Sequence, residues 1–457
     1  MAARVVVSAV ALALATLAAP GRAQQPAPQP PPVRSLGPIT RVSRDSLESA
    51  AAAVEVAGGG VYVNDITARR LLLFDSTLQS GTVVLDSSGE GASAYGTFAG
   101  TLLPFHGDSA LFIAPQALSM LVLGPQGRVA RVMAVPPTGG GLPALIGNIF
   151  GTPGFDARGR LVYFSPVRMQ FRATPGGELP RLEPPDSAFL VRFDVATRTL
   201  DTAAVIRIPQ TRSTVNRDDQ GRFHVTMTAF PPRTVDDWAV SADGAIAIVR
   251  GQDYHVDWLE PDGTRTSTPR MPYGWEHLND DEKAALIDST AKAMRAMMDS
   301  LPSRMERAGV GGSARTGGSG AGGDGGAAKT ADAGPTIVIR AAPGGPGGPG
   351  GPGGGGPPTS VRLVPTVTPA QPADVPDYRP AFGQGAVRAD RENNLWIRTN
   401  KWVDGRPVYD IVNRQGQLAD RVQLPPHRTI AGFGPGVLFM AVQDSAGVVH
   451  LERAQIK

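Results

Sequence analysis

The stretch Gly58-Gly59-Gly60-Val61-Tyr62-Val63 contains the pattern that decides the fold, a tight glycine or polar turn followed by a short apolar strand. The pattern recurs five more times. The later copies are Leu111-Phe112-Ile113, Leu161-Val162-Tyr163, Ile246-Ala247-Ile248, Leu395-Trp396-Ile397 and Val437-Leu438-Phe439. Further short strands and turns follow most copies. Four short strands per unit, repeating about every 40–50 residues, are the sequence signature of a β-propeller.

The spacing of the copies shows where the repeat is interrupted. Successive copies lie 50, 50, 85, 149 and 42 residues apart, so the units are regular at both ends and longer in the middle. The additional residues fall at 165–185, 209–233 and 270–382. We therefore predict a six-unit propeller over residues 36–457 with its main insertion at 270–382.

The main insertion has a helical part and a low-complexity part. Asn279 followed by Glu282 indicates a capping box. An apolar stripe at helical spacing comprises Leu278, Ile287, Ala291, Met294, Met298 and Leu301. These features predict a helix over about 280–300 that packs against the β-rich body. From about 303 to 360 the sequence is rich in Gly, Ala, Ser and Pro, which cannot bury a core and predicts disorder.

The last unit is one strand short when the chain ends. A spare alternating segment, Ile39–Val42, lies near the N-terminus and can supply the missing strand, which would remove the exposed edges. The predicted fold class is all-β: a six-bladed β-propeller closed by an N-terminal strand, with one helical and low-complexity insertion.

Residues 1–23 have the organisation of a signal peptide. Arg4 precedes an apolar run from Val5 to Ala19, and a small-residue cleavage site ends at Ala23. This run is too short to span a bilayer, which needs about 20 residues. We expect a disordered lead-in at 24–35, no transmembrane segment after signal removal, and an exported protein, periplasmic or extracellular.

Charge and cysteine content exclude several classes of function. The leader holds two arginines and no acid, so the 44 basic residues of the chain become 42 in the mature protein, against 41 acidic ones. This balance gives no general attraction to nucleic acid. With no cysteine, the protein has neither disulfides nor thiolates for metal binding or nucleophilic catalysis. We expect a monomer.

The C-terminal repeat carries a family resemblance. The run Asn393-Asn394-Leu395-Trp396-Ile397, followed by Tyr409-Asp410-Ile411-Val412 and Gln415-Gly416, is similar to a common blade of bacterial six-bladed β-propellers of the NHL-repeat and TolB-like class. The resemblance covers nearly everything outside the leader and the low-complexity insertion. It implies the architecture, but the class includes lactonases, lyases, sugar dehydrogenases and members that only bind.

The positions of the insertions indicate a binding face. In an antiparallel blade, the turns from the first to the second strand and from the third to the fourth share one face, and here these turns are short. All long insertions fall on the opposite face, and insertions concentrated on one face commonly mark a binding surface. Candidate ligand-contacting residues on that face are Trp275, His277 and Trp402; packing roles are the alternative for these side chains.

The propeller axis is the other candidate region. The innermost strands contribute Glu55, Asp237 and Arg388, which do not make a metal set by themselves. No calcium loop, phosphate loop or nucleophile elbow is present, so we predict no cofactor, no metal and no catalytic residue. The favoured function is non-catalytic binding of a protein, peptide or glycan through the insertion-bearing face. The alternative is a hydrolase or lyase of the lactonase type with an axial metal site.

Overall fold

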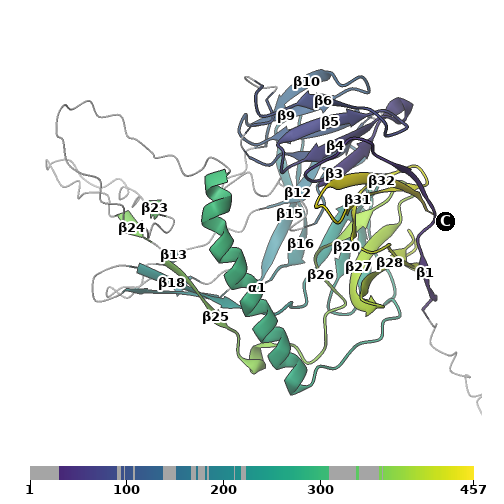
Figure 1. The fold of residues 1–457 in the computed structure, drawn as a ribbon. Helices are drawn as coiled ribbons and strands as arrows, with labels where there is room; N and C mark the ends of the chain where they lie inside the picture. The colour runs from purple at the N-terminus through teal and green to yellow at the C-terminus, as the bar shows by residue number, and fades with distance from the viewer. Residues whose placement is uncertain are drawn as a thin grey trace, which may run out of the picture.

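The computed structural model describes thirteen stretches of the chain, shown in Figure 1. They are residues 30–89, 94–96, 98–106, 109–136, 151–165, 171–172, 181–182, 185–209, 212–217, 223–307, 336–338, 360–362 and 364–456. The predicted signal peptide and most of the lead-in, and the greater part of the low-complexity segment, lie outside the described residues.

Six antiparallel sheets follow one another along the chain as blades. Blade 1 consists of β3 (Ala52–Glu55), β4 (Val61–Asp65), β5 (Arg70–Phe74) and β6 (Gly81–Leu85). Blade 2 consists of β7 (Thr101–Phe105), β8 (Ser109–Ala114), β9 (Ser119–Leu123) and β10 (Val129–Ala134). Blade 3 consists of β11 (Gly154–Phe155), β12 (Leu161–Phe164), β15 (Ser187–Phe193) and β16 (Leu200–Arg207).

The second half of the ring repeats this order. Blade 4 consists of β19 (Asp237–Val240), β20 (Ile246–Arg250), β21 (His255–Leu259) and β22 (Arg265–Ser267). Blade 5 consists of β26 (Phe382–Ala389), β27 (Leu395–Val403), β28 (Arg406–Val412) and β29 (Leu418–Gln423). Blade 6 consists of β30 (Arg428–Gly434), β31 (Val437–Gln443), β32 (Val449–Gln455) and β2 (Ile39–Val42). The predicted all-β, six-bladed propeller is confirmed.

The N-terminal segment closes the ring, as the sequence predicts. Strand β2 pairs antiparallel with β32 and becomes the outermost strand of blade 6. A second short strand, β1 (Val33–Ser35), adds in parallel to β29 of blade 5. The sequence predicts a single strand here, so the contact with blade 5 is an addition. The N-terminal segment therefore joins the last two blades.

Apolar side chains fill the spaces between adjacent blades and form the core. Between blades 1 and 6 the backbones come so close that a Cβ on Gly432 would lie 1.9 Å from the carbonyl oxygen of Ala53. Only glycine fits that approach. Between blades 5 and 6, Trp396 is fully buried with Leu36 and Leu438. The N-terminal segment thus contributes to the core as well as to the sheet.

Inserted segments from three places assemble into one further sheet beside the ring (Figure 1). Its strands are, in spatial order, β13 (Phe171–Arg172), β14 (Arg181–Leu182), β17 (Arg212–Arg217), β18 (Phe223–Ala229) and β25 (Val364–Pro369). A separate pair joins β23 (Thr336–Val338) to β24 (Ser360–Arg362). The sequence predicts the insertions but none of these strands.

Helix α1 (Asp280–Arg307) begins at the predicted residue and runs past the predicted end. The capping box is present: the backbone N–H of Glu282 donates to Asn279 Oδ1 at 2.9 Å, and that of Asn279 donates to Glu282 Oε2 at 2.9 Å. The helix packs against β18, β25 and the short helix η4 (Pro372–Asp374), so it covers the inserted sheet. The prediction that it packs on the propeller body is wrong. No helix among the described residues is long and apolar enough to cross a membrane.

Candidate functional site

The two faces of the ring differ in what they carry. The first-to-second and third-to-fourth strand turns define one face, which we call the turn face. The inserted segments leave blade 3 between β12 and β15, and leave the ring between β16 and β19 and between β22 and β26. Because strands alternate in direction, all three departures lie on the opposite face, which we call the insertion face.

An axial pocket of about 480 Å³ lies within the ring, and all six innermost strands contribute to its wall. Its larger apolar side chains include Val54, Leu103, Phe105, Phe155, Val240 and Phe433. On blades 4, 5 and 6 only the strand ends nearest the turn face line it, at residues 240–244, 388–391 and 431–433. The pocket is therefore displaced toward the turn face on that side of the ring, away from the insertions.

Three carboxylates lie at the wall of this pocket, and each is bound by its own turn. Asp390 accepts the backbone N–H of Asn394 at 2.8 Å and the indole N–H of Trp396 at 3.0 Å. Asp156 and Asp243 also accept backbone N–H groups from the turns around them. Aspartate is common in turns for this reason. These bonds to their own turns give the three carboxylates a role in holding the strand ends.

The three axial residues singled out from the sequence do not converge. Glu55 lies between blades 1 and 6, where burial raises the pKa of its carboxyl group although Arg453 and Arg391 oppose the shift. Asp237 lies at the start of β19 and accepts the backbone N–H of Val387 at 2.8 Å. Of the three residues, only Arg388 lines the pocket. Among the described residues, no group of three His, Cys, Asp or Glu side chains could hold a metal ion.

Asp237 lies at a contact between blades 4 and 5 and is not part of the pocket wall. Its bond to Val387 joins blade 4 to blade 5, and the Thr152 hydroxyl donates to the carbonyl oxygen of Val387 at 3.4 Å, which adds the segment leading into blade 3. Burial raises the pKa of Asp237 to about 7 against the opposing effect of these backbone N–H groups. The carboxyl group of Asp237 therefore has a structural role and a pKa well above that of an ordinary aspartate.

The titration of Asp237 predicts a pH dependence of stability. Between about pH 4 and pH 7 the unfolded chain has lost this proton while the folded protein keeps it, so ionisation destabilises the fold as pH rises through this range. We expect Asp237→Asn to remove that decrease, so that the urea midpoint of the variant gains on the wild type between pH 5 and pH 8. Asp75→Asn is the control, because hydrogen bonding by Thr77 lowers the pKa of Asp75 and places its titration below this range. A constant difference between variant and wild type would contradict the assignment.

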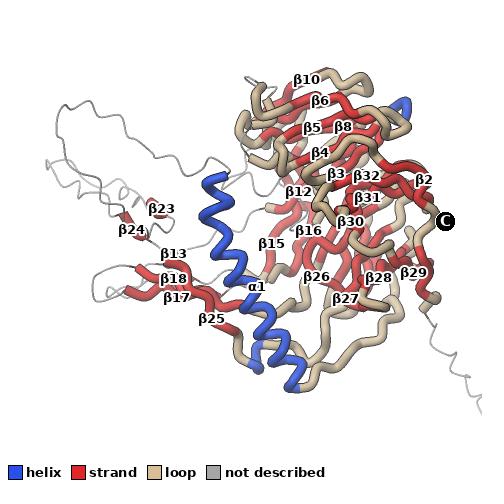
Figure 2. Tube along the Cα trace, in the orientation of Figure 1, coloured by secondary structure: helices blue, strands red, loops and turns tan. Residues whose placement is uncertain are grey.

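Trp275, His277 and Trp402 all lie on the insertion face, near blade 5. The segments that lead to and from the inserted module run side by side there, and we call residues 276–278 and 377–379 the stalk. Within the stalk, the backbone N–H of Leu278 donates to the carbonyl oxygen of Asp377, and the backbone N–H of Arg379 donates to the carbonyl oxygen of Glu276. Figure 2 shows these connecting segments as tan tubes between α1 and blade 5.

Aromatic rings gather on and beside the stalk. His277 meets Tyr378 edge to face at 5.2 Å, and Trp275 meets Tyr273 at 5.2 Å. The ammonium group of Lys401 lies 5.2 Å from the centre of the Tyr273 ring, which brings the end of β27 against this segment. Trp402 is the next residue and lies in β27 rather than in a loop.

Three of these rings are exposed. The exposed fractions are 66% for Trp402, 52% for Tyr378 and 39% for Trp275, and we call these three residues the aromatic patch. Tyr378 is not identified from the sequence, because only its backbone pairing with His277 brings it beside the other residues.

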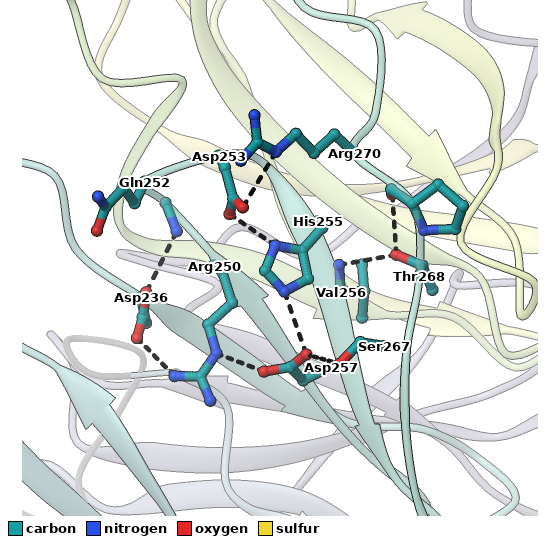
Figure 3. Close-up of polar contacts among 12 residues, drawn as sticks. Asp236, Arg250, Gln252, Asp253, His255, Val256, Asp257, Ser267, Thr268 and Arg270 are labelled. Carbon is teal, nitrogen blue, oxygen red and sulfur yellow. Dashed lines mark hydrogen bonds and ion pairs between the residues drawn. The ribbon is translucent and has the colours of Figure 1, made fainter.

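A second cavity, of about 700 Å³, opens on the insertion face between blades 3 and 4. Figure 3 shows its charged wall. His255 lies between two carboxylates, with Nδ1 2.6 Å from Asp253 and Nε2 3.2 Å from Asp257. Arg250 donates to Asp257 and to Asp236, each at 2.7 Å. Although burial lowers the pKa of Arg250, these bonds outweigh it and raise the pKa. Because these charged groups are paired, the network stiffens the insertion face.

The fold defines the class of this protein as a six-bladed β-propeller, which agrees with the resemblance seen in the sequence. No protein-family profile matches the chain, and no curated protein matches it either.

Solved structures give only distant likenesses. A member of the DUF4221 family from Bacteroides vulgatus aligns at 7% identity and a TM-score of 0.40, covering 93% of this chain and 96% of that one. A streptogramin B lyase aligns at 8% identity and a TM-score of 0.32, covering 91% and 86%. The calcium-binding protein regucalcin from Agrobacterium tumefaciens aligns at 12% identity and a TM-score of 0.31, covering 93% and 97%. Likenesses this weak carry no argument about function.

Proposed function

We propose that this protein is an exported, non-catalytic binding propeller whose aromatic patch docks a protein or peptide. The observation that carries the proposal is the exposure of Trp402, Tyr378 and Trp275 on one part of the insertion face. Tryptophan and tyrosine bury large areas with few rotatable bonds, and they are the side chains most enriched at the energetic centres of protein interfaces. The leader sequence supports export.

The surroundings of the patch favour a polypeptide ligand. Arg379 donates to Glu276 at 3.0 Å across the stalk, and Lys401 and Asp404 border the end of β27. A central aromatic cluster with charged residues around it is the usual arrangement of a protein interface. Trp275 packs against Tyr273, which packs against Tyr254, and Tyr378 packs against His277 on the hydrogen-bonded stalk, so these two rings of the patch are held before a ligand arrives. Pre-organisation of this kind reduces the entropy lost on binding.

The alternative function, a hydrolase or lyase with an axial metal site, has less support in the described residues. Asp156, Asp243 and Asp390 are bound by their turns, and Glu55 and Asp237 lie apart from the axial pocket. The residues described at the axis therefore offer no converging ligand set for the metal that this alternative requires.

The test is selection from a phage-displayed library of short random peptides on the immobilised protein. The selected peptides are then measured on the variant Trp402→Ala/Tyr378→Ala, with Phe189→Ala as the control because Phe189 is similarly exposed, at 52%, on blade 3. Losing an interface anchor costs about 2 kcal/mol, so we expect binding to weaken roughly 30-fold or more in the double variant and to be unchanged in the control. Equal binding by the double variant would refute the assignment. Binding to a glycan array that depends on the same two residues, without peptide selection, would replace the polypeptide ligand by a glycan.

A further inference from the structure

Arg388 is placed in the axial pocket without a counterion. It lies on β26, the innermost strand of blade 5, and is half-buried. Among the described residues, no hydrogen bond or ion pair engages its guanidinium group. Burial lowers the pKa of Arg388, and Tyr409 and Asp237 oppose this shift through space, without a bond. Other partly buried arginines of the ring are paired with carboxylates, for example Arg421 with Asp410 and Arg428 with Glu452, although Nε of Arg453 also has no partner among the described residues.

The three carboxylates of the pocket wall are bonded to groups other than this arginine. Asp390, two residues further on, is bound to its own turn and to Trp396. Asp243 accepts a bond from Arg414 at 3.1 Å, and Asp156 is paired with Arg160 at 2.7 Å. Among the described residues, none of these three carboxylates is therefore bonded to Arg388. Arg391, also on the wall, makes only a long contact of 3.4 Å to the carbonyl oxygen of Glu55.

The remainder of the wall is apolar. Phe105 and Phe155 meet edge to face at 4.8 Å, and Phe433 lies on the pocket wall from blade 6. The cavity volume of about 480 Å³ is within the range of pockets that hold small organic molecules. The Arg388 guanidinium group beside an apolar, aromatic wall matches a molecule with one anionic end and an apolar body.

We propose that the axial pocket binds a small organic carboxylate, with Arg388 holding the carboxylate and the phenylalanines covering the apolar body. Arginine presents a planar pair of N–H donors that match a carboxylate bidentately. A half-buried guanidinium without a bonded partner has lost part of its hydration, and a ligand carboxylate would supply that partner.

The experiment uses the full mature chain and a panel of octanoate, 3-phenylpropionate and indole-3-acetate, measured by titration calorimetry. The uncharged 3-phenylpropanamide has nearly the same shape as 3-phenylpropionate and reports the contribution of the charge. We expect saturable binding of at least one acid and at least tenfold weaker binding of the amide. We expect Arg388→Met to lose tenfold or more of the acid affinity and Arg388→Lys to lose less. Arg41→Met, which changes an exposed arginine on β2 at the outer edge of blade 6, should change nothing.

A second readout separates a binding role from a structural one. If Arg388 serves a ligand, Arg388→Met should leave the ligand-free melting temperature unchanged or raise it, whereas loss of a structural cation would lower it. The Trp402→Ala/Tyr378→Ala variant should bind the acid normally, so this site stands or fails independently of the aromatic patch. Equal affinity for acid and amide, unchanged binding by Arg388→Met, or no saturable binding of any acid in the panel would each overturn the proposal.

Discussion

Removal of residues 24–50 is expected to unfold the whole ring rather than to loosen one end. The deletion takes away β2, the outermost strand of blade 6, and β1, which pairs with blade 5. It also removes Leu36 and Leu47, which are 9% and 3% exposed within the core. Losing two buried leucines costs about 4–10 kcal/mol, which is most of the stability of a typical protein. We expect no cooperative melting transition, with aggregation on size-exclusion chromatography.

Two controls isolate closure from a general effect of truncation. Deletion of residues 24–29 stops before the first described strand, and Glu48→Ala changes an exposed side chain within the same segment. Both should melt as the wild type does. A monomeric protein lacking residues 24–50 that melts at the wild-type temperature would show that the ring closes without this segment.

The blades could be predicted because most of their paired strands follow one another directly in the sequence. Hairpin turns keep paired strands close along the chain, and their chemistry is local. In the turn after β28, for example, Asn413 Oδ1 accepts the backbone N–H of Gln417, and Gly416 adopts a φ of +74° that favours glycine. The closing strand could also be predicted, because counting strands shows that the last unit is incomplete.

The inserted sheet could not be predicted in this way. Thr226 of β18 lies beside Thr366 of β25, although 140 residues separate them in the sequence. No periodicity within one segment reports a pairing partner so far away. Strand β25 also contains Pro365 and Pro369, which argue against a strand when read alone. Both prolines are accommodated because β25 is the edge of its sheet.

The candidate sites were only partly accessible from the sequence. Trp275 and Trp402 could be assigned to the insertion face from the order of strands and insertions. Tyr378 could not, since its place depends on the pairing of the two stalk segments. Arg388 could be placed on an innermost strand, but its lack of a partner depends on where every carboxylate near the axis lies. Whether a side chain has a bonded partner depends on the three-dimensional positions of residues far apart in the sequence, so no sequence pattern reports it.

Asp410→Ala is expected to be the most destabilising single substitution among those considered, because Asp410 joins blade 5 to blade 4 in the core. It is 1% exposed, accepts the hydroxyl of Tyr254 at 2.8 Å and accepts Arg421 Nε at 3.1 Å. Burial raises the pKa of Asp410, against the effects of these two partners. The alanine variant would leave the Arg421 cation, whose side chain is 12% exposed, without its counterion.

Breaking a buried ion pair from one side costs about 3–5 kcal/mol, which should appear as a large fall in the urea midpoint of Asp410→Ala. Tyr254→Phe removes one hydrogen bond to a charged group and should cost about 1.5–3 kcal/mol. In the double variant the two costs should not add, since the hydroxyl has already lost its acceptor. Asp444→Ala, in an exposed turn of blade 6, is the matched control and should change the midpoint little. Strict additivity, or a cost for Asp410→Ala no larger than for Asp444→Ala, would show that blades 4 and 5 do not depend on this buried contact.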